Sequence, residues 1–315
     1  SRVGTSQPGY SPFAASSASA PMTTRCGTIA IIGKPNVGKS TLLNRIVGSK
    51  VSITSNKPQT TRHPVRGIRT DGNVQYVFVD TPGFQERHGG SLNRALNRSV
   101  SRSLDGVDVA LLVIIAGTIA PEDIRAFEEI PDTIDRIIVA NKSDRINGPA
   151  EMLPFLQKAN AQFGGLDIVP ISAQGGRNVD ELLAVIAKRL PEQPFMYEAD
   201  DVTDRDERFL AAEAIREKLF RTLGDEIPYA SVVAIESFQM EGTMRRIHAV
   251  IYVDRESHKG IIVGAGGGKL KKMASDARRD LEKLFAGKVH LEVWVKARHG
   301  WAENPNDLRR FGFEE

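Results

Sequence analysis

The strongest constraint on how this chain folds is a glycine-rich turn close to its start. Residues 33–40 read GKPNVGKS and match the pattern G-x-x-x-x-G-K-[ST] at every defined position. Residues 28–32 (TIAII) before the turn suit a buried strand, and residues 41–47 (TLLNRIV) after it suit a helix. Such a turn presents backbone N–H groups at the positive end of the helix dipole, where an anion binds. We therefore expect an α/β domain with an anion site at the end of its first strand.

The turn predicts a site for the phosphates of a nucleotide. The side chain of Lys39 is expected to reach the β- and γ-phosphates, and the hydroxyl of Ser40 is expected to bind Mg²⁺. The glycines allow the backbone to close around the β-phosphate. The residues predicted to surround the phosphates are Gly33, Lys34, Pro35, Asn36, Val37, Gly38, Lys39, Ser40 and Thr41.

The tetrapeptide Asp80-Thr81-Pro82-Gly83 is expected to belong to the same site. It follows the apolar residues YVFV and so comes directly after another strand. Asp80 is expected to hold Mg²⁺ through a water, and the N–H of Gly83 is expected to contact the γ-phosphate and sense its loss. The pattern D-x-x-G is common in turns, and it gains meaning here because a phosphate loop precedes it.

The sequence NKSD after the strand IIVA indicates which base the nucleotide carries. The carboxylate of Asp144 can accept hydrogen bonds from N1–H and N2–H₂ of guanine together, and adenine lacks that pair of donors. Lys142 can lie along the base, and Asn141 can tie the loops together. After the next strand come Ser172 and Ala173, and the N–H of Ala173 is expected to donate to guanine O6. These residues favour GTP over ATP.

A polar segment, residues 59–63 (QTTRH), lies between the first two motifs. One of its threonines is expected to bind Mg²⁺ on the side of the γ-phosphate; we favour Thr61, with Thr60 as the alternative. Few apolar residues hold the segment, which suits a loop that nucleotide orders and hydrolysis releases. A surface loop without function is the other interpretation. His63 is expected to face solvent rather than to act as a catalytic base.

Strand-like and helix-like segments alternate between residues 28 and 190, which predicts a mainly parallel sheet with helices on both faces. The turn Asp71-Gly72-Asn73 predicts a hairpin, and hence one antiparallel edge strand. The expected strands are Thr28–Ile32, Val65–Thr70, Val74–Val79, Val109–Ile115, Arg136–Ala140 and Ile168–Ile171. The expected helices include Lys39–Val47, Ser91–Leu104 and Asn178–Leu190.

Pro191 and Pro194 end this region, and an acidic stretch follows before a second unit begins. The second unit has the predicted order α-β-β-α-α-β. Its elements are Arg208–Leu223, Ser231–Gln239, Arg245–Asp254, His258–Val263, Lys269–Phe285 and His290–Ala297. Acidic and basic residues are unevenly distributed in this half of the chain. Residues 195–241 hold five Lys/Arg and 12 Asp/Glu, whereas residues 242–300 hold 13 Lys/Arg and six Asp/Glu. A basic surface in the later part suits a nucleic-acid partner.

Composition excludes several other classes of protein. The chain has 315 residues, a length typical of two domains, and a net charge of +3. Its single cysteine, Cys26, excludes a disulfide-stapled scaffold and a cysteine-ligated zinc site. No apolar run reaches the length of a membrane-spanning helix. Residues 1–21 are rich in Ser, Ala, Pro and Gly, so a flexible arm or a cloning remnant is expected, with a transit peptide as the alternative.

The motifs GKPNVGKST, QTTRH, DTPG, NKSD and ISA resemble those of the Era GTPases. The resemblance extends over about Arg25–Phe313 and includes DRDERFLAAEAIREKLF and VHLEVWVKARHGW. It implies a monomeric, cytoplasmic GTP-hydrolysing factor in assembly of the small (30S) ribosomal subunit, using Mg²⁺ and alternating between GTP and GDP. The implied partners are the 3′ end of 16S rRNA and the 30S pre-ribosomal particle. Weak peripheral association with the inner membrane is also allowed, although no amphipathic anchor or lipidation signal supports it.

The second unit resembles a type II KH domain, because GAGG at residues 264–267 lies between two helices. Glycines there let the loop approach a nucleic-acid backbone, and apolar side chains beside it can form a groove for unstacked bases. A solvated basic helix face is the alternative. The residues expected to bind RNA are Ile262, Val263, Gly264, Ala265, Gly266, Gly267, Lys269, Lys271 and Lys272.

One departure from Ras-type G domains concerns hydrolysis. Phe84 follows the DTPG motif where a Ras-like switch has a glutamine that positions water, and an apolar ring cannot do this. The resemblance therefore suggests a slow GTPase in which Asn36 helps to hold a K⁺ ion. The residues expected to act in hydrolysis are Lys39, Thr61, Gly83 and Asn36.

The sequence thus predicts a P-loop GTPase domain followed by an α+β type II KH domain. The expected boundaries are an arm or remnant over 1–24, a G domain over 25–192, a linker over 193–206, and a KH domain with a C-terminal tail over 207–315. Two other functions compete with an RNA-binding GTPase. The NKSD sequence argues against a kinase-like enzyme, and the intact nucleotide motifs argue against a passive RNA-binding protein with a degenerate G domain.

Overall fold

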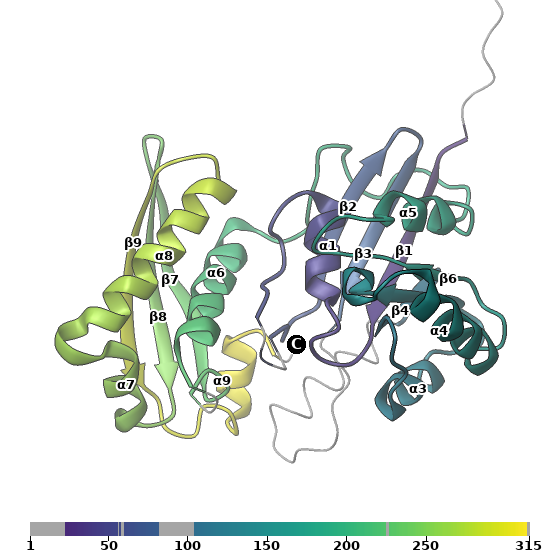
Figure 1. Ribbon diagram of the computed structural model, residues 1–315. Helices are drawn as coiled ribbons and strands as arrows, with labels where there is room; N and C mark the ends of the chain where they lie inside the picture. Colours follow the sequence, from purple (N-terminus) through teal and green to yellow (C-terminus); the bar gives the residue numbers. More distant parts are fainter. Residues whose placement is uncertain (1–22, 56, 58–59, 82–103, 225–226, 314–315) are drawn as a thin grey trace, which may run out of the picture.

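The computed structural model describes residues 23–55, 57, 60–81, 104–224 and 227–313. These residues form two domains that lie side by side (Figure 1). Some expectations fall outside them: the arm over 1–21, the residues Pro82, Gly83 and Phe84, and all but the last residue of the helix Ser91–Leu104. Within the described ranges, no helix is long and apolar enough to cross a membrane.

A six-stranded sheet with the order β2-β3-β1-β4-β5-β6 forms the centre of the first domain. Its strands are β1 (Arg25–Ile32), β2 (Val65–Asp71), β3 (Val74–Asp80), β4 (Val109–Ile115), β5 (Asp135–Asn141) and β6 (Ile168–Pro170). All neighbouring pairs are parallel except β2 and β3, which form the antiparallel hairpin at Gly72. The prediction of a parallel sheet with one antiparallel edge strand is confirmed.

Helices cover both faces of this sheet, α1 and α5 on one face and α3 and α4 on the other. Their bounds are α1 Lys39–Val47, α3 Pro121–Glu128, α4 Pro149–Gln162 and α5 Val179–Ala187. Both faces of β4 are therefore buried: Leu111 packs in the cluster that contains α1, and Leu112 packs against α3 and α4. This arrangement brings the strand ends that carry the predicted nucleotide motifs to one edge of the domain.

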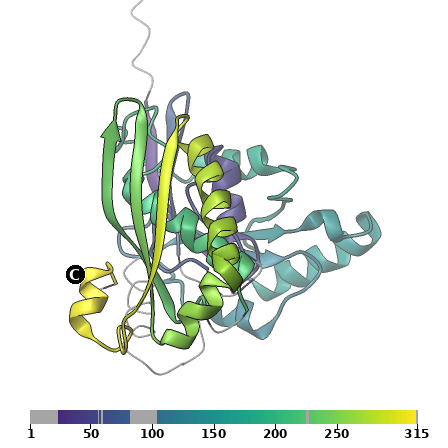
Figure 2. The same ribbon diagram turned by 90° about the vertical axis from the view of Figure 1, so that its left-hand side faces the viewer.

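The second domain is a three-stranded sheet, β7-β8-β9, with helices packed along it (Figure 2). Strands β7 and β8 are antiparallel, and β8 and β9 are parallel. The observed elements are α6 (Glu207–Thr222), β7 (Ser231–Glu241), β8 (Met244–Val253), α7 (Glu256–Val263), α8 (Gly268–Leu284) and β9 (Val289–Ala297). Their order is the predicted α-β-β-α-α-β.

A short helix that the sequence did not predict, α9 (Pro305–Arg310), follows β9. It packs on the face of the sheet opposite α8, as the yellow helix in Figure 2 shows. Leu308 and the preceding Trp301 are fully buried there against Val232 and Tyr252. The six-residue helix is too short to show helical periodicity, and it is stabilised by this packing.

The segment predicted to be a linker, residues 193–206, lies against the first domain. The side-chain oxygen of Gln75 accepts hydrogen bonds from the N–H groups of Met196 and Tyr197, at 2.8 and 3.0 Å. The N–H of Ile68 in β2 donates to the carbonyl of Val202 at 3.0 Å. The connection between the domains is therefore built into the edge of the first domain.

Candidate nucleotide and RNA sites

The phosphate loop is closed around the side chain of Lys39. Its ammonium donates to the carbonyls of Gly33 and Lys34, at 2.8 and 3.0 Å. Burial lowers the pKa of Lys39 to about 8, although the nearby carboxylate of Asp80 acts in the opposite direction. A bound phosphate would add negative charge beside Lys39 and so favour its charged form.

Gly38 in the loop cannot be replaced without strain. It has a φ of 104°, and a Cβ there would lie 2.3 Å from the side-chain nitrogen of Asn141. Asn141 uses that nitrogen to donate to the carbonyl of Val37 at 2.8 Å. The glycine thus permits the close contact that joins the phosphate loop to the end of β5.

Three oxygen-bearing side chains meet at the mouth of the loop. The hydroxyl of Ser40 donates to Oδ2 of Asp80 at 2.6 Å, and Oγ1 of Thr61 lies 3.2 Å from Oγ of Ser40 and 3.3 Å from that same Oδ2. The other carboxylate oxygen, Oδ1, is buried with no hydrogen-bond partner among the described residues. Burial raises the pKa of Asp80. A hydrated Mg²⁺ fits this set of hard oxygen donors, because it would satisfy the buried Oδ1.

The two threonines of the polar segment differ in where their hydroxyls point. Thr60 donates to the carbonyl of Lys57 at 2.8 Å, away from Asp80. Thr61 lies with Ser40 and Asp80. The geometry thus favours Thr61 over Thr60 as the cation ligand.

Sequence reasoning missed Ser52 as a member of this site. Its buried hydroxyl donates to Oδ2 of Asp80 at 2.9 Å. Oδ1 of Asn44 holds the backbone there, because it accepts from the N–H groups of Val51 and Ser52 at 3.0 and 2.9 Å. No motif or spacing marks a serine in this position, so only the folded backbone reveals it.

The predicted base-recognition residues come together beside the phosphate loop. Lys142 donates to the carbonyl of Asn36 at 2.6 Å, and the hydroxyl of Ser172 donates to the carboxylate of Asp144. That hydrogen bond lowers the pKa of Asp144, which favours the ionised form that can accept from two guanine donors. The N–H of Ala173 donates to Oδ1 of Asn141 at 2.9 Å, so its predicted bond to guanine O6 would have to be shared with that acceptor.

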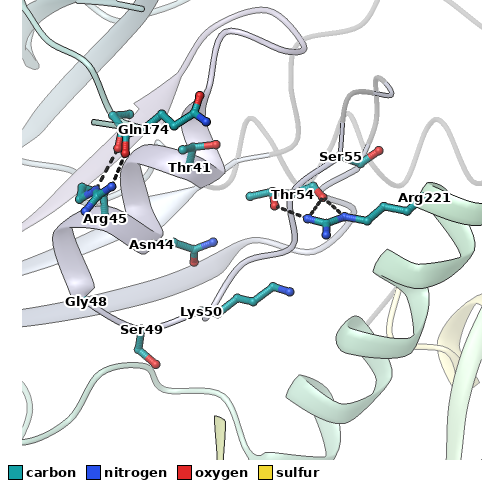
Figure 3. Close-up of a pocket in the computed structure, with 11 residues that line it drawn as sticks. Thr41, Asn44, Arg45, Gly48, Ser49, Lys50, Thr54, Ser55, Gln174 and Arg221 are labelled. Carbon is teal, nitrogen blue, oxygen red and sulfur yellow. Dashed lines mark hydrogen bonds between the residues drawn. The ribbon is translucent and has the colours of Figure 1, made fainter. Parts of the chain in front are cut away.

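Arg45 of α1 also belongs to the base-recognition region, although no motif contains it. Its Nε donates to the carbonyl of Ala173 at 3.0 Å, and its Nη2 donates to the carbonyl of Gln174 (Figure 3). The guanidinium thereby fixes the loop that follows β6. Beside it lies a cavity of about 760 Å³ between α1 and Arg221 of α6, which Figure 3 shows.

Lys34 contributes to the site differently from what its position in the motif suggests. Its ammonium lies 3.1 Å from Oδ2 of Asp123, a fully buried carboxylate near the start of α3. The same oxygen accepts from the N–H of Ala120 at 2.8 Å. The side chain of Lys34 is thus engaged by α3, which leaves its backbone to face the phosphates.

In the second domain, a glycine turn lies directly before the start of α8. Gly264, Gly266 and Gly267 have φ angles of 71°, 56° and 77°, and the first turn of α8 contains no acidic residue. Lys269, Lys271 and Lys272 are exposed on that turn. The structure therefore presents free helix N–H groups and cations on one surface, as an RNA backbone would require.

The structure places one of the predicted RNA-site side chains in the domain core. Ile262 is fully buried with Ile251 and Met273. Its neighbour Ile261 is 45% exposed. The sequence run Ile-Ile-Val does not reveal which isoleucine points inward, because all three residues are apolar.

The expectation that His63 faces solvent is wrong. Its ring stacks on Phe313 with centroids 4.6 Å apart and lies edge-on to Phe209 at 6.0 Å. Burial lowers the pKa of His63 to about 4. Its partners, Phe209 and Phe313, lie far along the chain from His63, and the sequence of the loop does not predict these contacts.

Two family profiles match the chain. One, described as "50S ribosome-binding GTPase", covers residues 28–142, and the other, described as "KH domain", covers residues 226–302. The chain is 51% identical over 290 residues to the GTPase Era of Nitrosomonas eutropha, covering 92% of this chain and 98% of the relative. It is 48% identical over 289 residues to the GTPase Era of Chromobacterium violaceum, with the same coverage.

Two solved structures resemble the whole molecule. An Era variant from Aquifex aeolicus bound to GDP·AlF₄⁻ has a TM-score of 0.89 at 38% identity, covering 93% of this chain and all of that one. Era in complex with MgGDPNP and nucleotides 1506–1542 of 16S ribosomal RNA has a TM-score of 0.88 at 38% identity, with the same coverage. The predicted fold class, a P-loop GTPase domain followed by a KH domain, is confirmed.

Proposed function

The chain belongs to the Era family of GTPases, and on that premise we propose that it is a GTP-driven switch in small-subunit (30S) assembly. We propose that its KH domain binds the 3′ end of 16S rRNA, and this proposal is supported by the solved complex of a related Era with nucleotides 1506–1542 of 16S rRNA. The observation that carries the proposal is the open start of α8. Three exposed lysines and a glycine turn lie there, and none of the three lysines makes an ion pair within the described residues.

For GTP binding, the proposed ligands are the motif residues already described. Ser40, Thr61 and Asp80 would hold Mg²⁺, which neutralises phosphate charge when bound. Lys39, Asn36, Thr61 and Gly83 are proposed to act in hydrolysis. The residues proposed to contact the nucleotide are Gly33, Lys34, Pro35, Asn36, Val37, Gly38, Lys39, Ser40, Thr41, Thr60, Thr61, Asp80, Gly83, Asn141, Lys142, Asp144, Ser172 and Ala173.

We further propose that a K⁺ ion beside Asn36 supports hydrolysis. Asn36 is exposed and lines a small cavity with the polar segment, including Thr60 and Thr61. A cation there could stabilise charge on the transferring phosphoryl group. Turnover should be faster in KCl than in NaCl at equal ionic strength, and equal turnover in the two salts would rule the proposal out.

RNA binding is tested by reversing charge at the start of α8. A variant with Lys269→Glu and Lys271→Glu should bind an RNA fragment of the 16S 3′ end more weakly and with a smaller salt dependence. GTP hydrolysis by this variant should be unchanged. Lys283→Glu, an exposed lysine in the last turn of the same helix, is the matched control. Unchanged RNA affinity in the double variant would remove the glycine turn from the RNA site.

The state of the nucleotide provides a second test. RNA crosslinking in GTP and in GDP, with the bound nucleotides mapped, should give different patterns for a switch and identical patterns for a passive RNA-binding protein. We propose the domain boundaries 25–192, 193–206 and 207–315 and a monomeric, cytoplasmic protein. Weak peripheral association with the inner membrane remains a separate proposal, which co-sedimentation with anionic vesicles would test.

A further inference from the structure

The side chain of Arg62 extends from the nucleotide site into the KH domain. It directly follows Thr61, and its side chain is almost fully buried. Nη1 donates to the carbonyl of Ser231 at 2.8 Å, and Nη2 donates to the carbonyls of Pro228 and Tyr229 at 3.0 and 2.9 Å. All three acceptors lie between α6 and the start of β7. One guanidinium therefore joins the polar segment of the G domain to a single turn of the KH domain.

The charge of Arg62 is held by carbonyls. Its acidic neighbour Glu213 binds Arg216 through both carboxylate oxygens, at 2.7 and 2.6 Å. Burial lowers the pKa of Arg62 to about 9, and the charge of Arg216 acts in the same direction. Within the described residues no carboxylate pairs with Arg62, so this desolvated cation depends on the carbonyl turn and on the ring of Phe220, whose centroid lies 6.0 Å from Cζ. The hydroxyl of Ser231 supports that turn, because it donates to the carbonyl of Pro228 at 2.9 Å.

The loop between α1 and the polar segment also contacts the KH domain. Lys50 pairs with the buried Glu217 of α6 at 2.5 Å and with Asp280 of α8 at 2.8 Å. Arg221 of α6 donates to the hydroxyl and carbonyl of Thr54, at 3.1 and 3.3 Å (Figure 3). The chain is therefore fixed to the KH domain before Thr61, through Lys50 and Thr54, and directly after it, through Arg62.

We propose that Arg62 is a positioning residue for nucleotide binding: its three bonds to the KH domain hold Thr61 where it can bind the Mg²⁺ of GTP. The inference rests on the proposed role of Thr61. Thr61 would contact the cation on the side of the γ-phosphate, which GDP lacks. The KH domain would then stabilise the GTP-bound state over the GDP-bound state, because only the former uses the position that Arg62 fixes.

Loss of the Arg62 bonds should affect GDPNP binding more than GDP binding. Arg62→Met, which keeps length but removes all three bonds, should weaken binding of the GTP analogue GDPNP by about tenfold, within the range typical of coupling between sites. GDP affinity should change less than about twofold. Arg62→Lys should give an intermediate loss, because an ammonium cannot reproduce the fork of a guanidinium.

The experiment measures the dissociation constants of GDPNP and GDP for the full chain by fluorescence, at several Mg²⁺ concentrations. Arg66→Met is the matched control, because Arg66 lies in β2 and makes an exposed ion pair with Asp204 at 3.2 Å. It should leave the ratio of the two constants unchanged. If Arg62→Met does not fold, judged by its circular dichroism and thermal melt, the ratio for Arg62→Lys decides.

Thr61→Val separates failure of the inference from failure of the proposed site. If Thr61→Val lowers GDPNP affinity but Arg62→Met leaves the ratio unchanged or weakens both nucleotides equally, the positioning role is wrong and the site stands. If Thr61→Val leaves the ratio unchanged, the proposed cation site is wrong and the role of Arg62 falls with it. A selective loss of GDPNP binding in both variants supports the proposal.

Discussion

The hydroxyl of Ser52 donates to Oδ2 of Asp80 at 2.9 Å, and both side chains are buried. The bond fixes the carboxylate in the orientation that Ser40 also uses, at 2.6 Å from the same oxygen. A residue outside every nucleotide motif thus sets the direction in which Asp80 presents its unpaired oxygen.

Ser52→Ala should weaken Mg²⁺ binding at the nucleotide site. Loss of a hydrogen bond to a charged group costs roughly 1.5 kcal/mol, so the Mg²⁺ concentration needed for half-maximal GDPNP binding should rise about tenfold. Ser49→Ala, in the same loop, is the control. A Mg²⁺ titration of Ser52→Ala that overlays the wild-type curve would contradict the role assigned to Ser52.

Asp144→Asn should remove the preference for guanine. The amide keeps one acceptor oxygen but presents N–H₂ in place of the other, so one of the two guanine donors would be left unpaired and GTP affinity should fall by about 10³-fold or more. Xanthine has a carbonyl in place of the 2-amino group, so binding of XTP should improve. Competition of GTP and XTP for the site measures both effects. Asp180→Asn, an exposed acid in the first turn of α5, should change neither.

His63 should make the protein less stable in acid. Its pKa is about 4 in the folded protein and about 6.5 when unfolded, so between these values the unfolded chain binds the proton more readily. Stability should therefore fall as the pH drops from about 6.5 toward 4, by at most about 3 kcal/mol and less where water reaches the ring. Glu213 favours protonation, whereas Arg62, Arg205 and Arg216 oppose it.

His63→Phe is the variant that isolates this effect. It keeps a ring between Phe209 and Phe313 but cannot be protonated. The free energy of unfolding, measured by urea titration across this pH range, should depend less on pH in the variant than in the wild type. Identical slopes would mean that carboxylates alone account for acid sensitivity.

Leu308→Ala should loosen α9 from the KH sheet. Leu308 is fully buried, and truncating a buried leucine costs about 2–5 kcal/mol. Both tryptophans of the chain, Trp294 and Trp301, lie in or beside that sheet, so their fluorescence reports on this domain. Its unfolding midpoint in urea should fall, while GTP hydrolysis at low temperature should persist. Leu153→Ala, at a leucine that is 59% exposed, should leave the midpoint unchanged.

The sequence was sufficient for those parts of the protein whose chemistry requires particular residues at fixed spacing. The phosphate loop needs Gly38 because no Cβ fits beside Asn141. The motif therefore predicts the backbone conformation at this position. The mainly parallel sheet with helices on both faces follows similarly, since strands buried on both faces, such as Val109–Ile115, consist almost entirely of apolar residues.

Other features depend on long-range contacts that no local pattern encodes. Ser52 and Arg45 act through backbone and carboxylate partners far along the chain, and ordinary loop or helix positions give no hint of them. The polarity of residues 59–63 suggested a weakly held loop, yet Arg62 and His63 are engaged by the KH domain. The burial of Ile262 could not be predicted, because a run of apolar residues does not show which of its side chains points inward.

The hydrogen bond from Ile68 to Val202 has a consequence for the reach of the RNA-binding domain. An extended chain spans about 3.3–3.6 Å per residue, so residues 193–206 would give the KH domain a long tether if they were free. Because Val202, Thr203 and Arg205 are hydrogen-bonded to β2 and to Pro64 just before it, almost no free tether is left before α6. The same contact shields an otherwise open strand edge from pairing with another chain. Any wide movement of the KH domain would first have to break these hydrogen bonds, and it would leave this edge of β2 unpaired.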